Sequence, residues 1–258
     1  LKMDLTQILD GYPGHEHTFP VYPLYEDVVG LTAESQAAYT PTLLVNYGGP
    51  WAENYFYTRE NPHDNAKLQR FMPHSEIDQR TRRKGMGAGP GPGGWFMEEE
   101  HVFDEQAETL AAIVDQGGRA GVGSHGQLQG LGYHWELWAM ATGGLSNHET
   151  LRLATRTGAE AIGLGEDLGS IEQGKLADLV VLRKNPLDNL RHTQSIRYVM
   201  KNGRLYEGDT LDEVYPRSRE LPTMWWQRTG PDGDVPGASR TRDGVSQDDI
   251  SLDESLQN

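Results

Sequence analysis

Histidine side chains are the main candidates for metal or acid–base chemistry in this chain. The sequence has nine histidines and no cysteine, which excludes disulfides, thiolate metal ligands and a cysteine nucleophile. His15 and His17 are two residues apart, so on a strand they would share one face, as in the His-x-His spacing of metal sites. His125 stands among small residues, and His134 precedes Glu136 in an aromatic-rich segment. Neutral imidazole can bind zinc or take up a proton, so we expect these histidines to act as metal ligands or in acid–base chemistry.

The composition is that of a folded, acidic chain. Its 258 residues are 36% hydrophobic, which is enough apolar mass for a core. With 23 basic and 38 acidic residues the formal charge is −15, so nucleic acid is not an expected partner, because phosphate contacts need clustered Lys and Arg. No stretch approaches the roughly eighteen apolar residues of a membrane span. The chain begins at Leu1 without a signal-like leader, so we interpret it as a processed product or a piece of a longer protein.

Short apolar strands that alternate with helices predict an α/β fold for the first part of the chain. Strands are expected at residues 10–18, 39–45 and 119–123. Helical periodicity or a capping pattern predicts helices at residues 24–31, 103–114, 135–142 and 146–158. Three parallel strands that end near Thr18, Asn46 and Gly123 would place His17 and His125 on the same rim, which is the edge formed by the carboxyl ends of the strands.

The rest of the chain falls into three kinds of segment. Residues 51–100 lack regular periodicity, and the Gly/Pro-rich run 85–94 predicts a flexible loop. This run is not a phosphate-binding loop, because it lacks the Gly-Lys-Ser/Thr ending. Residues 169–206 predict a small antiparallel sheet with a hairpin turn at Asn202-Gly203, in which Asp178 caps a strand. Few apolar residues follow position 229, so that tail is expected to be disordered.

Two groups of motifs resemble the metal-dependent amidohydrolases. The run Gly169-Ser-Ile-Glu-Gln-Gly-Lys-Leu-Ala-Asp-Leu-Val-Val-Leu182, preceded by Leu145-Ser-Asn-His-Glu-Thr-Leu-Arg-Leu-Ala-Thr155, is similar to the carboxyl-terminal signature of that family. Glu16-His17 and Pro41-Thr-Leu43 look like strands six and seven of its imidazolonepropionase and prolidase-like branch. The sequence around Gly123-Ser-His-Gly126 resembles that of one subgroup of the family, whose longer members carry Tol-type β-propeller repeats.

This resemblance implies a division of the chain. Residues 1–165 would be the carboxyl-terminal part of a (β/α)8 barrel, at about strands six to eight. Residues 166–215 would contribute to a β-sandwich, and residues 216–258 would be an extension, largely disordered after 229.

The resemblance also assigns roles to the two rim histidines. His17 would bind a divalent metal, zinc by preference, and the alternative is a solvated loop histidine beside Glu16. We expect His15 to support the site or lie on the surface rather than to ligate, because the family's His-x-His belongs to a strand outside this chain. His125 replaces the usual aspartate of strand eight, so it would serve as ligand or general base, unless the site has lost that function.

Several aromatic and polar residues are candidates for substrate contact. Tyr47 and Trp51 follow the second predicted strand and would face a barrel mouth, where they would bind substrate or pack against a neighbouring domain. His134 and Glu136 would contact substrate or hold His125, although Glu136 would equally suit the positive end of a helix dipole. Trp135, like Trp138, is expected in the core or a pocket wall.

The expected function is hydrolysis of a C–N bond in a small amide or peptide-like molecule by a metal-activated water. The alternative is a non-catalytic fragment or partner-dependent module, because three strands do not close a barrel. The expected partners are therefore a small substrate and either the amino-terminal half of the barrel or an oligomeric partner. The sequence leaves localisation open, although longer members of the subgroup are often exported.

Overall fold

A computed structural model describes residues 1–84, 96–126 and 128–227. The predicted loop at 85–94 and the predicted tail after 229 lie outside these residues. The chain forms two compact units, Leu1–Glu220 and Leu221–Asn258. Within the second unit the described residues include one 3-10 turn, Trp225–Gln227. Among the described residues, no helix is both long and apolar enough to cross a membrane.

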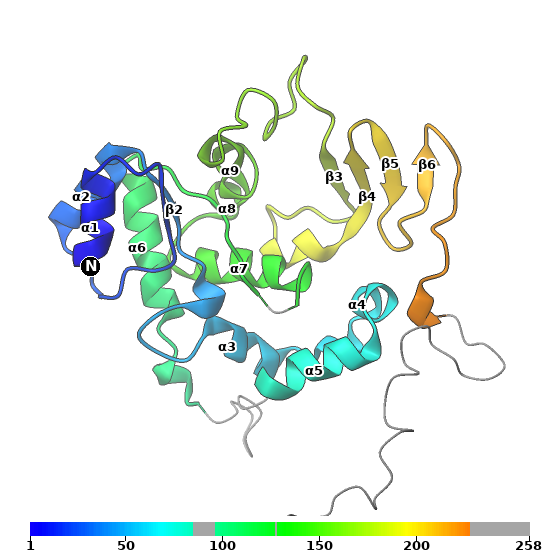
Figure 1. The fold of residues 1–258 in the computed structure, drawn as a ribbon, viewed down its shortest axis with the longest axis horizontal. Coiled ribbons are helices and arrows are strands. Elements are labelled where there is room, and N and C mark those ends of the chain that lie inside the picture. The colour runs from blue at the N-terminus through cyan, green and yellow to red at the C-terminus, as the bar shows by residue number, and fades with distance from the viewer. Residues whose placement is uncertain (85–95, 127, 228–258) are drawn as a thin grey trace, which may run out of the picture. The chain divides into compact units, whose positions relative to one another are not determined.

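The first unit combines helices with two separate sheets (Figure 1). Its helices are α1 Lys2–Leu9, α2 Glu26–Ser35, α3 Ala52–Arg59, α4 Ala66–Phe71, α5 His74–Lys84, α6 Phe103–Asp115, α7 Leu131–Thr142, α8 Asn147–Leu153 and α9 Arg156–Ala161. Its strands are β1 Gly14–Glu16, β2 Ala38–Thr40, β3 Leu179–Leu182, β4 Ile196–Lys201, β5 Arg204–Glu207 and β6 Glu213–Tyr215. The predicted α/β class is confirmed.

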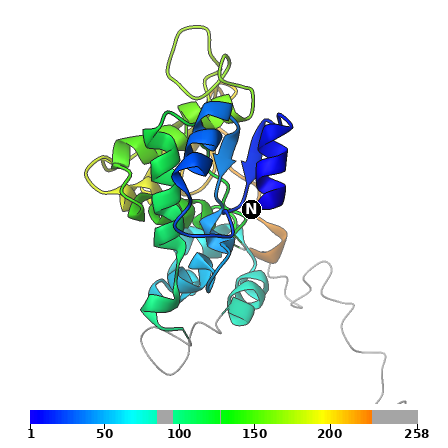
Figure 2. The same ribbon diagram turned by 90° about the vertical axis from the view of Figure 1, so that its left-hand side faces the viewer.

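The first sheet is short and parallel. β1 pairs with β2 in parallel, with His15 opposite Tyr39, and Figure 2 shows these two blue strands side by side. Tyr39 forms a further parallel bridge with Ala120, so the segment before His125 runs alongside β2 in the same direction. The predicted parallel arrangement of three segments is confirmed, and the carboxyl ends of all three lie at one edge.

The second predicted strand is shorter than expected. β2 ends at Thr40, and Leu43–Val45 forms a 3-10 helix instead of continuing the strand. Pro41 offers no N–H to a sheet, and Thr42 has a left-handed backbone with φ 53°. The prediction of an extended segment to Val45 was therefore wrong.

The second sheet is antiparallel in the order β3-β4-β5-β6. The Asn202-Gly203 turn between β4 and β5 is confirmed, with both residues at positive φ. Asp178 accepts a hydrogen bond from the N–H of Asn202 at 2.8 Å and pairs with Lys201, so it holds the end of the β4–β5 hairpin, a contact that the sequence did not predict.

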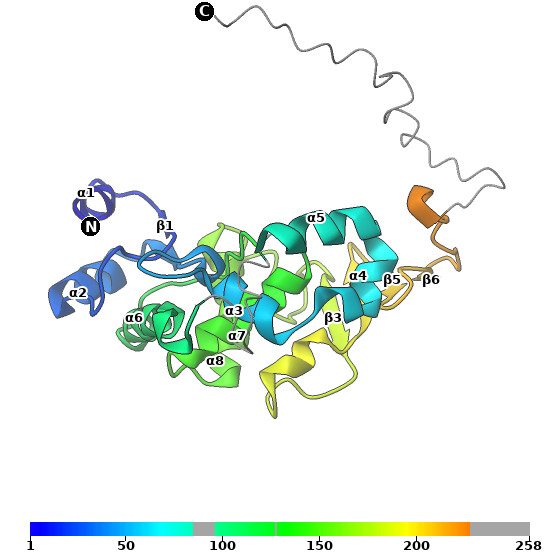
Figure 3. The same ribbon diagram turned by 90° about the horizontal axis from the view of Figure 1, so that it is seen from below.

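Residues 51–84 are helical, contrary to the prediction of irregular structure. Asn65 caps α4 by accepting from the N–H of Leu68 at 2.9 Å. These helices have few apolar residues at regular spacing, which is why periodicity missed them. Seen from below in Figure 3, α4 lies beside the second sheet.

The core lies between the parallel strands and the long helices α6 and α7. Its fully buried side chains include Tyr39, Leu110, Ile113, Trp135 and Met140. Trp135 stacks on Phe56 with ring centroids 5.4 Å apart, which joins α7 to α3. The expectation that Trp135 and Trp138 are core residues is confirmed, because both are buried.

Candidate functional site

His17 and His125 meet where the parallel strands end. Their ring centroids are 5.8 Å apart, although 108 positions separate them in the chain (125 − 17 = 108). His17 directly follows β1 and donates its backbone N–H to the carbonyl oxygen of Thr40 at 2.8 Å, which ties it to the end of β2. His125 follows the bridge at Ala120. The structure therefore places both histidines on the expected rim.

Both histidines have an unusual backbone conformation. φ is 69° at His17 and 43° at His125, in the left-handed region that few residues other than glycine adopt. Such strain persists where surrounding structure enforces it, and it is concentrated at functional sites. The left-handed conformation turns the chain at each of these two positions.

His15 lies in the core and not on the rim. It is 5% exposed and stacks on Phe19, with ring centroids 4.5 Å apart, and on Tyr39 at 5.7 Å. Burial lowers the pKa of His15, so the ring is neutral at pH 7. Among the described residues its Nε2 has no hydrogen-bond partner. The turn at His17 explains the separation, because the two residues no longer share one strand face.

Tyr47 and Trp51 lie on the segment that follows β2. The Tyr47 ring is 6.3 Å from His17 between centroids, and its backbone N–H donates to Thr18 Oγ1 at 3.1 Å. Trp51 directly precedes α3 and is 41% exposed. Tyr47 thus lies beside the histidine pair with its side chain half exposed.

Glu136 holds the 3-10 turn after β2. It is fully buried in α7, and its carboxylate accepts from the N–H groups of Leu43 at 2.7 Å and Leu44 at 2.9 Å. Burial raises its pKa to about 8, and the two backbone hydrogen bonds partly oppose that shift. Because α7 begins at Leu131, Glu136 is not in the first helical turn, and the helix-dipole interpretation was wrong.

His134 faces a different part of the molecule. Its Nδ1 is 3.0 Å from Thr193 Oγ1, and it lines a cleft of about 680 Å³ together with Leu68, Leu131 and Gln194. Burial lowers the pKa of His134 to about 4, helped by the charge of Lys67, so the ring is neutral at pH 7. Neither rim histidine lines this cleft. The structure therefore does not group His134 with His17 and His125.

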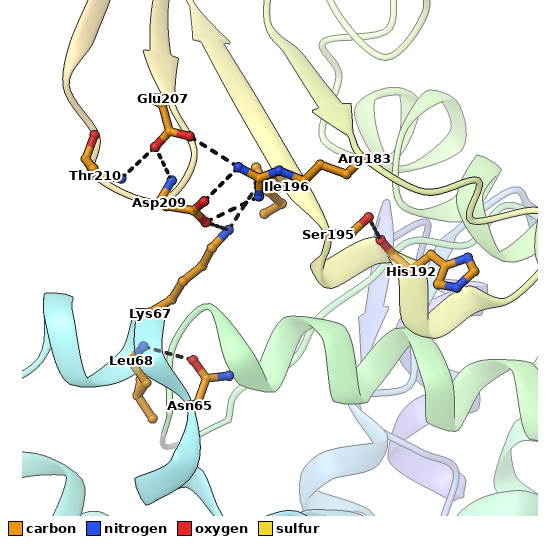
Figure 4. Close-up of polar contacts among 10 residues, drawn as sticks. All are labelled: Asn65, Lys67, Leu68, Arg183, His192, Ser195, Ile196, Glu207, Asp209 and Thr210. Carbon is orange, nitrogen blue, oxygen red and sulfur yellow. Dashed lines mark hydrogen bonds and ion pairs between the residues drawn. The ribbon is translucent and has the colours of Figure 1, made fainter.

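An ion cluster borders the same cleft and joins α4 to the second sheet (Figure 4). Lys67 Nζ lies 3.1 Å from Asp209 and also donates to the carbonyl oxygen of Ile196 at 3.2 Å. Arg183 binds the other oxygen of Asp209 at 2.7 Å and lies 3.3 Å from Glu207. Sequence reasoning missed this cluster because its members come from segments far apart in the chain.

Two imidazoles meet at the rim, His17 and His125, and a second pair, His63 and His74, has ring centroids 5.3 Å apart. In the part of the chain that the structure describes, no group of three or more His, Cys, Asp or Glu side chains is arranged to hold a metal ion. Two imidazoles that share a zinc ion at about 2.0–2.1 Å have ring centroids roughly 5–6 Å apart, so the separation of His17 and His125 fits two ligands of one site. A complete tetrahedral site needs further donors.

The comparison with protein families decides the identity of this fold. The model of the amidohydrolase family matches residues 7–206. The chain belongs to the amidohydrolase family. This confirms the resemblance inferred from the motifs at residues 145–182 and at the strand ends.

The relatives of this amidohydrolase chain are considerably longer proteins. A 5-methylthioadenosine/S-adenosylhomocysteine deaminase of Teredinibacter turnerae is 34% identical over 128 residues, which cover 44% of this chain and 29% of the deaminase. A solved Xaa-Pro dipeptidase with bound methionine matches with a TM-score of 0.51 and 24% identity, over 80% of this chain and 42% of the dipeptidase. A putative prolidase from Bifidobacterium longum also has a TM-score of 0.51, at 21% identity, over 84% of this chain and 45% of its own. The two structures support the fold alone, and this chain spans less than half of each relative.

Proposed function

We propose that this chain is the carboxyl-terminal portion of a metal-dependent amidohydrolase that hydrolyses C–N bonds in small amides or peptide-like molecules. The observation that carries the proposal is the meeting of His17 and His125 at the carboxyl ends of parallel segments. Active sites of (β/α)8 enzymes lie at that end of the strands. The relative named as a deaminase supports the reaction class, because that name describes cleavage of a C–N bond.

The proposed roles follow from position and chemistry. His17 and His125 would hold a divalent metal, zinc by the preference of imidazole donors. When bound, such a metal supplies an activated water and polarises the carbonyl group. His125 would serve as ligand or would accept a proton from the attacking water at a ring nitrogen. Tyr47 and Trp51 would offer half-exposed aromatic surface to the substrate. His134 lines a separate cleft that neither rim histidine lines, so it is not among the residues proposed to contact the substrate at the rim.

The proposal assigns a part of the fold to each segment of the chain. Residues 1–165 would supply strands six to eight of the barrel, residues 166–215 would contribute to a sandwich, and residues 216–258 would extend beyond it. Three parallel segments cannot close a barrel, and the rim pair needs additional ligands. Activity would therefore require the amino-terminal half of the barrel or an oligomeric partner.

A specific observation favours a second candidate, a non-catalytic or partner-dependent module. Only two donors converge at the rim within the described residues. A chain that keeps this fold without binding metal would fit that alternative.

Zinc content and rate distinguish the candidates. We expect substoichiometric or weak zinc binding by this chain and full occupancy in a longer protein that also carries the preceding strands. In that longer protein His17→Ala should abolish zinc binding, and His125→Ala should lower the rate at least about 10²-fold. His125→Asp restores the usual family residue and suits the left-handed backbone, so it should keep metal and part of the activity. Full activity and metal content in His125→Ala would contradict the role of His125.

A further inference from the structure

Glu136 places a carboxyl group where burial alone would favour an apolar side chain. It is fully buried within α7, between Trp135 and Leu137 in the sequence. Burying such a group costs free energy unless hydrogen bonds compensate. Each of its two oxygens accepts one backbone N–H, from Leu43 and from Leu44. The carboxylate is therefore matched to one particular turn of the chain.

The hydrogen bonds within this turn come from the N–H groups of Val45 and Asn46. The N–H groups of Leu43 and Leu44 donate instead to Glu136. Pro41 has no N–H, and the left-handed conformation of Thr42 turns the following residues away from the sheet. Without Glu136 the N–H groups of Leu43 and Leu44 would lose these partners inside the core, where unpaired donors are costly. Glu136 thus fixes the turn against α7.

The same turn supports the loop that carries His125. A Cβ atom added at Gly123 would lie 3.1 Å from Thr42 Oγ1, and one at Gly126 would lie 3.0 Å from Leu44 Cδ1. An added side chain would be too close at both positions, so the loop lies close against the turn two residues before His125 and directly after it. A displacement of the turn would therefore move His125 relative to His17.

We propose that Glu136 is a positioning residue for the rim site: it holds the Thr42–Leu44 turn, and the turn sets the place of His125 beside His17. The contact chain runs from the carboxylate through two backbone N–H groups to the two glycines that flank His125. The use of this arrangement for metal binding rests on the proposed function, whereas the geometric coupling does not.

The test compares Glu136→Leu and Glu136→Gln with a matched control, Glu149→Gln. Glu149 also accepts a backbone N–H, from Ser146 at 2.9 Å, but it does so in the capping box of α8. Two readouts are needed: zinc affinity by calorimetry, and the nuclear Overhauser contact between the ring protons of His17 and His125 in the metal-free chain. Gly126→Ala provides an independent disturbance, because it pushes the loop away from Leu44 without altering the carboxylate.

We expect Glu136→Leu and Gly126→Ala to weaken zinc binding about 10- to 100-fold and to abolish the ring contact. Glu136→Gln retains one acceptor oxygen and the side-chain shape, so it should fold and give an intermediate loss. Glu149→Gln should lower the melting temperature and change neither readout. If the Glu136 variants lowered the melting temperature but kept the ring contact, the inference would be wrong. If the parent chain bound zinc too weakly to measure, the ring contact alone would decide the inference. Absence of zinc from the longer protein would put the proposed function in doubt and would leave this inference standing.

Discussion

At the residue scale, the chemistry of this chain depends on side chains placed by unusual backbone. His17 and His125 both adopt positive φ after parallel segments, and their ring centroids are 5.8 Å apart. His15, two residues from His17, is instead enclosed by aromatic rings. The role of a histidine therefore depends less on its neighbours in the sequence than on the backbone conformation that orients its side chain.

His134 should make the stability of the chain sensitive to acid. Its folded-state pKa of about 4 lies below the usual 6.5, because burial disfavours the charged ring. The contribution of the neutral His134 ring to the free energy of unfolding is fully present above pH 6.5. It is lost as the pH falls toward 4, because the histidine of the unfolded chain takes up a proton at a higher pH than the buried one. Between pH 7 and 4.5 we expect His134 to account for a loss of about 2–3 kcal/mol in the free energy of unfolding. Urea titrations at both pH values should show that His134→Gln removes this part of the loss.

The exposed His148 on α8 provides the control, since His148→Gln should follow the parent at both pH values. An equal acid-induced loss in His134→Gln and the parent would show that the ring is not buried as described.

Sequence identified the rim histidines through motifs at strand ends and offered support of His125 as one use of Glu136, but it could not identify the partners of that side chain. A carboxylate between Trp135 and Leu137 is visible as an anomaly in an apolar helix. Its partners, Leu43 and Leu44, lie more than ninety residues away, at separations of 93 and 92. Local propensity carries no information about such a contact.

At the element scale, locally encoded features were predictable and non-locally enforced ones were not. The capping box of Ser146 and Glu149 forms as expected, because both partners lie in one turn. The predicted helix 146–158 is nevertheless split into α8 and α9 at Thr155, which has φ −130° and ψ −91°. The turn after β2 likewise depends on α7, so the extended pattern of residues 39–45 was misleading.

The crossing of α6 and α7 depends on the absence of a side chain at Gly143. A Cβ there would lie 2.1 Å from the carbonyl carbon of Ala107 and 2.4 Å from the backbone nitrogen of Glu108. Backbone atoms cannot rotate away, so Gly143→Ala should force the helices apart and cost at least about 3 kcal/mol. Thermal and urea unfolding followed by circular dichroism would measure the loss.

Gly30→Ala is the matched control for that substitution. Gly30 lies within α2, where an added Cβ meets only Gln116 Oε1 at an ordinary 3.5 Å. Alanine should there stabilise the helix by about 0.5–1 kcal/mol. Equal stability of the two variants would contradict the described helix crossing.

At the scale of the first unit, the second sheet exposes apolar side chains at one of its edges. Val180 is 59% exposed and Val181 43% exposed, and because neighbouring residues in a strand point to opposite faces, both faces of β3 are open. The order β3-β4-β5-β6 also leaves β3 at an edge. An exposed apolar edge of this kind favours pairing with another chain or segment.

The open edge of β3 should make this chain associate with itself. We expect sedimentation velocity to show reversible association that increases with protein concentration. Val181→Lys introduces a charge at the edge and should shift the chain toward monomer, with a melting temperature within a few degrees of the parent, because the side chain it replaces is already half exposed. Thr157→Lys, on α9 outside this sheet, is the control for added charge and should leave association unchanged. A parent chain that stayed monomeric at all concentrations would show that the edge of β3 does not pair with another chain.

The same substitution can be made in a longer protein that carries the preceding strands. If Val181→Lys prevented that protein from reaching full zinc occupancy, β3 would be the strand at which the missing part of the fold joins this one.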